Sequence, residues 1–416
     1  MLAVLSNRVY RRLFTAQVVA LTGTGLATVA LGLLAYDLAG ADAAAVLGTA
    51  LAIKMIAYVG VGPLAGALAA SVPRKALLVT LDVVRAAVAL CLPWVDQIWQ
   101  VYLLIFLLQA CSATFTPTFQ ATIPDVLAGE RDYTRALSLS RLAYDLESLL
   151  SPLLAAAALA VVGYDVLFAG TAAGFAASAL LVVSALLPAS RATPANRGLH
   201  ATVRGLRVYL ATPRLRGLFA AHLAVAAAGS MVLVNTVTYV RDVLGRGETA
   251  VALALAANGL GSLTAALALP RLLDRCRDRT VMLRAGVVLA SALLLGVPAT
   301  ALPDAQRWPV LLVLWAAIGS GSALVLTPSG RLLRRSAGPG ELPALFAADF
   351  SLSHACWLLC YPLAGWLATE AGMAAALAVL GVLTIGATAL AVRLWPAHDP
   401  DMPLVSAAPS VTSRSS

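Results

Sequence analysis

Most of the basic residues of this 416-residue chain lie in alternate loops. Apolar runs are broken by short polar loops, and 23 of the 29 Lys and Arg residues lie at the two ends or in every second loop. The intervening loops hold only Arg241, Arg246 and Arg307. Cytoplasmic loops of membrane proteins retain Lys and Arg. The pattern therefore predicts a multi-pass protein of the cell inner (cytoplasmic) membrane with both termini in the cytoplasm.

Twelve apolar runs predict twelve transmembrane helices and an all-α fold. The chain is 60% hydrophobic, and most runs reach the ~20 residues needed to cross the hydrocarbon core as a helix. The predicted spans are 13–36, 46–70, 76–95, 100–122, 134–162, 164–187, 214–239, 248–270, 281–302, 308–330, 344–369 and 372–395.

The net charge of +9 does not indicate a nucleic-acid partner. The charge is spread over the edges of the spans, where anionic membrane lipids are the natural partner. The five cysteines lie in or beside spans and form no disulfide framework. The segment 397–416 is rich in Pro, Ser and Ala and predicts a disordered cytoplasmic tail.

The second half of the chain repeats landmarks of the first. Leu326–Ser329 falls on Phe115–Thr118 with an offset of 211 residues, and Tyr361–Ala364 falls on Ser151–Leu154 with an offset of 210. A parallel repeat of this kind predicts two six-helix bundles that meet around a central cavity. The predicted units are an N-terminal bundle (1–190), a linker (191–213), a C-terminal bundle (214–396) and the tail (397–416).

The linker has an amphipathic pattern. Leu199, Val203, Leu206 and Leu210 recur at helical spacing, with the arginines largely on other faces. This predicts an amphipathic helix on the cytoplasmic leaflet, and the alternative is a plain basic linker.

Twelve spans, a repeat of six and six, and a basic loop after the second span together resemble the major facilitator superfamily over about residues 10–395. The loop signature of that family is a glycine, then Asp-Arg, then a glycine and two basic residues. Gly66–Lys75 keeps the basic pair Arg74 and Lys75, whereas Ala70 stands in place of the acid and Ser71 in place of the first basic residue.

The resemblance implies that these loops latch the cytoplasmic gate by charge pairing. Because Ala70 removes the acid of the first loop, we expect that latch to be weaker or to use another acid, such as Asp82. The loop residues assigned to the gate are Arg74, Lys75, Asp274, Arg275 and Arg279.

Other stretches resemble one branch of the superfamily, the permeases for macrolide efflux, enterobactin export and nickel resistance. These stretches are Thr114–Pro124, Leu233–Tyr239 and Tyr361–Trp366. In the fifth span, Glu147–Ala156 matches the antiporter signature of the family at Pro152 and in its small residues. The likeness implies efflux by alternating access, without a cofactor.

The fifth span holds the densest group of ionisable residues at membrane depth, where each charge needs a partner or a function. Arg141 and Asp145 lie four residues apart and predict a neutralised structural pair, although Asp145 also remains a coupling candidate. Glu147 lies near mid-membrane without a local cation. It is either a proton site or a protonated structural acid that bonds to Tyr144.

Two other spans carry charges. Asp82 and Arg85 lie three residues apart in the third span and predict a structural ion pair. Lys54 is alone in the second span, so it either extends toward the membrane surface or faces an acid across the cavity.

The eleventh span carries Asp349, His354, Cys356 and Cys360. His354 and Asp349 are further proton candidates, because histidine titrates near neutral pH. The cysteines and His354 are soft metal ligands, but residues two apart on one helix point to different faces, so no metal site is predicted. The remaining candidates for lining the cavity are His222, Asn235 and Asn258.

The leading hypothesis is a monomeric, proton-coupled exporter of amphipathic small molecules, without cofactor and without enzymatic activity. No P-loop pattern is present for ATP use. The alternatives are efflux of a divalent transition metal of the nickel type and, more remotely, a membrane-embedded enzyme that uses His354 as a base.

Overall fold

The computed structural model describes residues 2–127, 157–187, 196–337 and 342–397, together with 132, 136, 139, 140, 143, 147, 150, 151, 154 and 155. Three residues with predicted roles, Arg141, Tyr144 and Asp145, lie outside this set, as does the tail from residue 398. Within the described part of the chain there is no β-strand, as predicted for an all-α protein.

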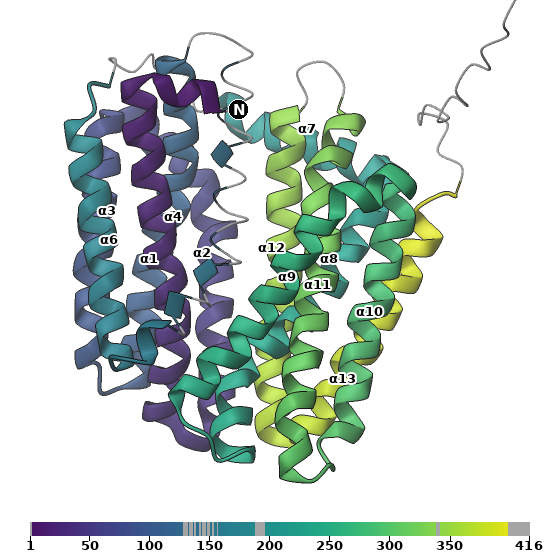
Figure 1. The fold of residues 1–416 in the computed structure, drawn as a ribbon. Coiled ribbons are helices and arrows are strands. Elements are labelled where there is room, and N and C mark those ends of the chain that lie inside the picture. Colours follow the sequence, from purple (N-terminus) through teal and green to yellow (C-terminus); the bar gives the residue numbers. More distant parts are fainter. Residues whose placement is uncertain are drawn as a thin grey trace, which may run out of the picture.

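Long helices make up the described structure (Figure 1). The helices of the first half are α1 (Arg8–Ala39), α2 (Ala43–Ser71), α3 (Arg74–Cys91), α4 (Ile98–Val126) and α6 (Tyr164–Ser184). Those of the second half are α8 (Pro213–Thr238), α9 (Glu248–Arg275), α10 (Asp278–Ala299), α11 (Asp304–Ser336), α12 (Leu342–Ala371) and α13 (Met373–Leu394). Helix α7 (Asn196–Ala211) lies between the halves in sequence.

These helices account for eleven of the twelve predicted spans. Ten segments of the described chain are long and apolar enough to cross a membrane, and one of them, Arg8–Val61, covers both α1 and most of α2. The twelfth predicted span, 134–162, is described only in part, and every described residue from 132 to 159 is helical. The chain is thus a multi-pass integral membrane protein.

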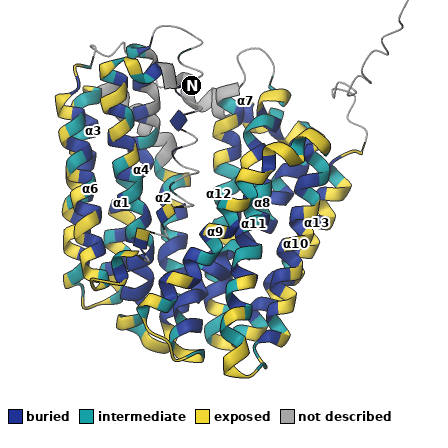
Figure 2. Ribbon diagram, viewed as in Figure 1, coloured by how far each residue is buried: buried dark blue, intermediate teal, exposed yellow. Residues whose placement is uncertain are grey.

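The helices form two bundles, which we call the N-half and the C-half (Figure 1). In the N-half, α1 packs on α6 and α2 on α4; in the C-half, α9 packs on α11 and α8 on α13. Exposed residues lie on the outer faces of both bundles and buried ones between the helices (Figure 2). Large apolar side chains such as Leu180 and Val313 are exposed on those faces, which suits contact with lipid chains.

The N-half and C-half meet along α2 and α12. Gly48 of α2 lies so close to α12 that an added Cβ would be 2.6 Å from the carbonyl oxygen of Tyr361. Conversely, a Cβ on Gly365 of α12 would be 2.2 Å from the carbonyl oxygen of Ala44. Small residues allow such close packing in membranes. This reciprocal contact fixes how the two halves touch, and we call it the seam.

Two ends of the molecule can be distinguished. The N-terminus, α7 and the start of α3 and α10 lie at one end, which we call the basic end (Figure 1). The turns after α1, α8 and α12 lie at the other, which we call the far end.

Local signals define the helix limits. The side chain of Asn7 caps α1 by accepting hydrogen bonds from the backbone N–H groups of Val9 and Tyr10 at 3.0 and 3.1 Å.

Candidate functional site

At the basic end of the N-half, Arg74 of α3 forms an ion pair with Asp125 of α4. The neighbouring Lys75 donates to the carbonyl oxygen of Ala185 at 3.0 Å. Of the possibilities left open for this loop, the structure has another acid in contact with Arg74, but that acid is not Asp82, which is buried deeper in the bundle and pairs with Arg85. The acid comes instead from the end of α4.

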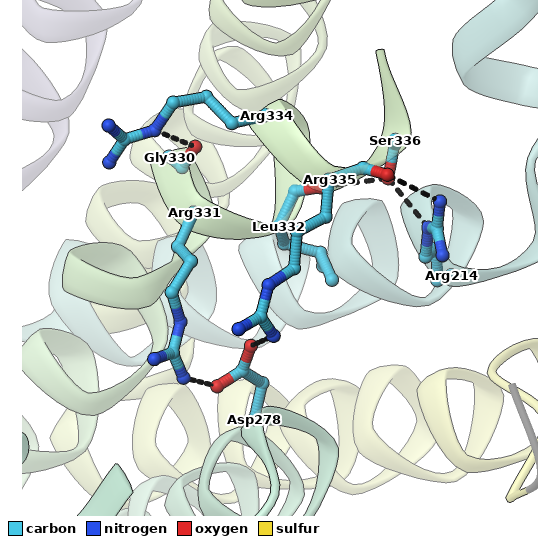
Figure 3. Close-up of polar contacts among 8 residues, drawn as sticks. All are labelled: Arg214, Asp278, Gly330, Arg331, Leu332, Arg334, Arg335 and Ser336. Atoms are coloured by element: carbon cyan, nitrogen blue, oxygen red, sulfur yellow. Dashed lines mark hydrogen bonds and ion pairs between the residues drawn. The ribbon is translucent and has the colours of Figure 1, made fainter. Parts of the chain in front are cut away.

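In the C-half, the matching position carries the opposite charge (Figure 3). Asp278, the first residue of α10, binds Arg331 through Oδ1 and Arg335 through Oδ2, the latter at 3.1 Å. Asp278 is 1% exposed. The guanidinium of the N-half pair thus begins α3, whereas the carboxylate of the C-half pair begins α10. The two halves thus make an ion pair at the same place, but the positive and negative residues are exchanged between the two helices.

The predicted gate residues of the C-half make other contacts. Arg279 donates to the carbonyl oxygens of Trp395 and Val392 at 2.9 and 3.3 Å, and so caps the end of α13. Asp274 and Arg275 are exposed at the end of α9. Sequence reasoning named Asp274 and missed Asp278, although both acids flank the same loop.

A second ion pair is buried inside the N-half. Asp82 and Arg85 of α3 pair through Oδ1 and Nη2, and Ser178 of α6 donates to the other carboxylate oxygen at 2.7 Å. The Arg85 guanidinium lies between the rings of Phe115 and Phe175, 4.3 and 4.4 Å from their centroids. The structure confirms this predicted pair and places it in the interior of the N-half, where it joins α3, α4 and α6.

Glu147 lies against α1 in the interior of the N-half. Ser151 donates to its Oε1 at 3.5 Å. A Cβ on Gly25 of α1 would be 2.8 Å from the same oxygen, so the glycine leaves room for the carboxylate. The charges of Lys54 on α2 and Glu147 interact, and both side chains stay partly accessible. Lys54 therefore lies near enough to Glu147 for the two charges to attract each other.

In the C-half, a buried carboxylate joins three elements. Asp349 of α12 accepts at Oδ1 from the hydroxyl of Tyr209 at 2.9 Å, and Nε2 of His222 lies 3.1 Å from the same oxygen. Tyr209 belongs to α7 and His222 to α8. Burial, together with the adjacent carboxylate, raises the pKa of Tyr209, so the phenol stays a hydrogen-bond donor.

His354 lies at the seam. Its Nδ1 donates to the carbonyl oxygen of Phe350 at 2.6 Å. The Tyr58 ring of α2 is 5.3 Å from the imidazole and 5.8 Å from the Phe350 ring. The aromatic contact therefore brings the predicted histidine of the C-half against the N-half, one turn from Lys54 along α2.

The two asparagines proposed for the cavity bind helix backbones instead. Asn235, which is fully buried, donates to the carbonyl oxygen of Ala364 at 3.2 Å. Asn258 donates to the carbonyl oxygen of Trp315 at 3.0 Å. In this conformation both amides hold neighbouring helices together. The described residues contain no group of three His, Cys, Asp or Glu placed to hold a metal ion.

Comparison with known families places the chain. The sequence profile of the Major Facilitator Superfamily matches residues 13–247 and again residues 218–415. The chain belongs to this superfamily. The two matches cover the two halves, in agreement with the internal repeat and with the two bundles of the structure.

Solved structures of superfamily type share the fold at low sequence identity. A variant of the nucleoside transporter NupG has a TM-score of 0.71 at 14% identity over 93% of this chain and 100% of that one. An inward-facing, unoccupied bacterial homologue of the human lysosomal transporter Spinster has 0.70 at 12% over 93% and 96%. The D-xylose-proton symporter has 0.68 at 14% over 94% and 98%. No curated protein matches the sequence.

Proposed function

We propose that this superfamily member is a proton-coupled exporter of amphipathic small molecules that works by alternating access. The observation that carries the proposal is Glu147, a carboxylate in the interior of the N-half that lies against Gly25 of α1, accepts a hydrogen bond from Ser151 and stays partly accessible. Ionisable residues inside a membrane protein mark proton relays, and a carboxylate that water can reach is able to gain and lose the proton that coupling requires.

Lys54 and Glu147 supply an exchange step. With Glu147 ionised, the two charges neutralise each other in a medium of low dielectric constant. A proton that arrives from outside neutralises Glu147 and leaves Lys54 without that partner, which changes the electrostatic free energy of the site. The cost of the uncompensated charge favours the conformation in which Lys54 reaches water or another acceptor. Proton binding can thus bias one conformation.

The basic end is the cytoplasmic end in this proposal. The retention of 23 Lys and Arg residues in one set of segments supports this orientation in the inner membrane. The bundles 1–190 and 214–396 would then rock about the seam, with 191–213 as the connection. Outward transport rests on the likeness of Thr114–Pro124 and Tyr361–Trp366 to the efflux branch.

Nickel-type metal efflux remains the second candidate. The two cysteines that suggested it, Cys356 and Cys360, are 4% and 0% exposed. Their burial gives the metal hypothesis no support beyond the branch likeness. Replacing both with alanine should leave nickel, cobalt and zinc tolerance of the cell unchanged, and a loss of tolerance would favour metal efflux over the drug hypothesis.

Dye transport in everted membrane vesicles tests the proposal. Vesicles acidified inside should accumulate amphipathic dyes such as ethidium when they contain the wild-type protein, and Glu147→Gln should abolish accumulation. Glu370→Gln makes the same chemical change at an exposed site on α12 and should leave accumulation intact. Normal accumulation by Glu147→Gln, or accumulation unaffected by a protonophore, would overturn the coupling proposal.

A further inference from the structure

The last turn of α8 departs from α-helical geometry at the far end. Residues Tyr239–Val243 form a π-helical turn, in which the N–H of Leu244 binds the carbonyl oxygen of Tyr239 at 3.1 Å. A π turn holds one residue more than an α-helical turn, and such turns are rare and occur frequently at functional sites. The side chains of this turn make a contact with the N-half.

That contact is Tyr36 of α1, in the opposite half. The Tyr36 hydroxyl donates to Oδ1 of Asp242, and the Arg241 guanidinium lies over the Tyr36 ring, 4.8 Å from its centroid. Consecutive residues of the π turn thus hold one side chain by its hydroxyl and by its ring face. Arg241 is itself oriented by Glu248 at the start of α9, 3.7 Å away.

Further contacts join the two halves toward the far end. A Cβ on Gly32, one turn before Tyr36, would lie 3.1 Å from Val237 of α8. Trp366 of α12 donates to the hydroxyl of Thr49 on α2 at 3.4 Å across the seam. The N-half and C-half are therefore in contact at the far end, and these bonds must break if that end opens.

We propose that the π turn with Tyr36, Arg241 and Asp242 is a latch that keeps the far end closed, and that the turn converts to regular α-helix when the latch opens. Conversion to α-helical geometry changes the rotation from each residue of the turn to the next, so Asp242 and Arg241 can no longer both face Tyr36. The π turn is the arrangement in which Arg241 and Asp242 both reach Tyr36 of the opposite half.

The latch therefore has two states, closed and open. With the latch closed, the hydroxyl–carboxylate bond and the cation–π contact stabilise the π turn. With the latch open, these contacts are lost and the turn takes the commoner α-helical geometry. A segment with two nearly balanced arrangements is what a transporter needs at a gate that opens and closes in each cycle.

The test measures the separation of the halves directly. Spin labels at Val161 in the N-half and Ala301 in the C-half, both exposed in turns at the far end, report opening by electron–electron distance measurement in nanodiscs. Because the labels need cysteines, the five native ones are replaced. Tyr36→Phe keeps the ring and removes the hydroxyl, and it should raise the ratio of open to closed populations about fivefold, the effect of one lost hydrogen bond.

The matched control is Tyr164→Phe. Tyr164 also donates its hydroxyl to a carboxylate at the far end, Asp37 at 2.7 Å, but both residues belong to the N-half. The control should therefore leave the distance distribution of the parent protein unchanged. An equal response of Tyr36→Phe and Tyr164→Phe, whether zero or not, would overturn the latch.

Deletion of Val243 tests the role of the π turn. The deletion removes the extra residue, should produce a regular helix and should open the far end at least as much as Tyr36→Phe, whereas Val243→Ala should not. If the deletion variant does not fold, a second measurement takes its place. Hydrogen exchange of residues 239–250 is then measured in the Tyr36→Phe protein, which keeps its native cysteines. Faster exchange than in Tyr164→Phe supports the latch, and equal exchange contradicts it. Neither measurement needs substrate or a proton gradient, so a failure of the coupling proposal would remain distinguishable.

Discussion

The hydroxyl of Tyr209 lies 2.9 Å from the Asp349 carboxylate, although the two residues are 140 positions apart in the chain. Tyr209 is completely buried, and a Cβ on the neighbouring Gly205 would be 2.3 Å from the carbonyl oxygen of Ala344. Helix α7 is therefore docked on α12 at the basic end. Asp349, a candidate for proton coupling, is engaged in holding it.

Loss of that bond should loosen α7. Tyr209→Phe removes the donor and leaves the ring in place, at a cost of about 1 kcal/mol. Hydrogen exchange in residues 204–211 should accelerate about fivefold, which is the same free energy expressed as a ratio. Tyr10→Phe, which removes a hydroxyl bonded to Ala136 in the N-half at 3.2 Å, should not change exchange in α7. Equal protection of α7 in both variants would show that the bond does not hold the helix.

Asp278 should matter more than either of its arginines. Asp278→Asn leaves Arg331 and Arg335 without their carboxylate, and we expect the loss to destabilise the C-half by about 1–3 kcal/mol, since both guanidinium groups are partly solvated. Arg335→Gln should cost less, because Asp278 keeps Arg331. Thermal unfolding in detergent measures the order of the two effects, and a larger loss for Arg335→Gln would contradict the shared-carboxylate arrangement.

The seam predicts a conformational block. Gly365→Leu places side-chain atoms where the backbone of Ala44 lies, since even a Cβ would be 2.2 Å from that carbonyl oxygen. The variant should keep the far end open, with a longer distance between labels at Val161 and Ala301. Gly60→Leu, where an added Cβ meets no atom within 4 Å, is the control. If Gly365→Leu gives the control's distance, the seam does not determine closure.

Topology offers a simpler test. Because the basic residues gather in alternate segments, reporter fusions after Arg216 and after Arg414 should both behave as cytoplasmic. Fusion after Arg246, in a loop of the other set, should behave as periplasmic. A periplasmic signal from either of the first two fusions would reverse the proposed orientation.

The spans were predictable because their signal is local. Runs of Leu, Ala and Val set the helices within a few residues: the predicted span 281–302 corresponds to α10 at Asp278–Ala299. The ion pair between Asp82 and Arg85 could also be predicted from the sequence, because residues three apart on one helix share a face.

Partners on different helices were not predictable in this way. Asp278 and Arg331 are 53 positions apart, and Arg74 and Asp125 are 51 apart. Hydropathy and spacing do not indicate which end residues of two helices meet. The sequence pattern therefore directed attention to Asp274 and Asp82, whereas packing selected Asp278 and Asp125.

Helix α7 shows both cases in one element. The apolar stripe that includes Leu206 and Leu210 could be predicted from the sequence. These two residues are 36% and 43% exposed, as contact with the membrane surface would require. That contact stays a prediction. The face that docks on α12 carries Tyr209 and Gly205, neither of which interrupts the pattern in a way that signals a partner.

The most direct test of the central claim compares two kinds of transport in proteoliposomes. A dye that the vesicle assay identifies as a substrate is followed once by exchange at equal pH and once by accumulation against an imposed pH gradient. Glu147→Gln should keep exchange near the wild-type rate and lose gradient-driven accumulation, because the carboxamide cannot carry the proton. Accumulation by Glu147→Gln equal to that of the wild type would contradict the assignment of Glu147 as the coupling site.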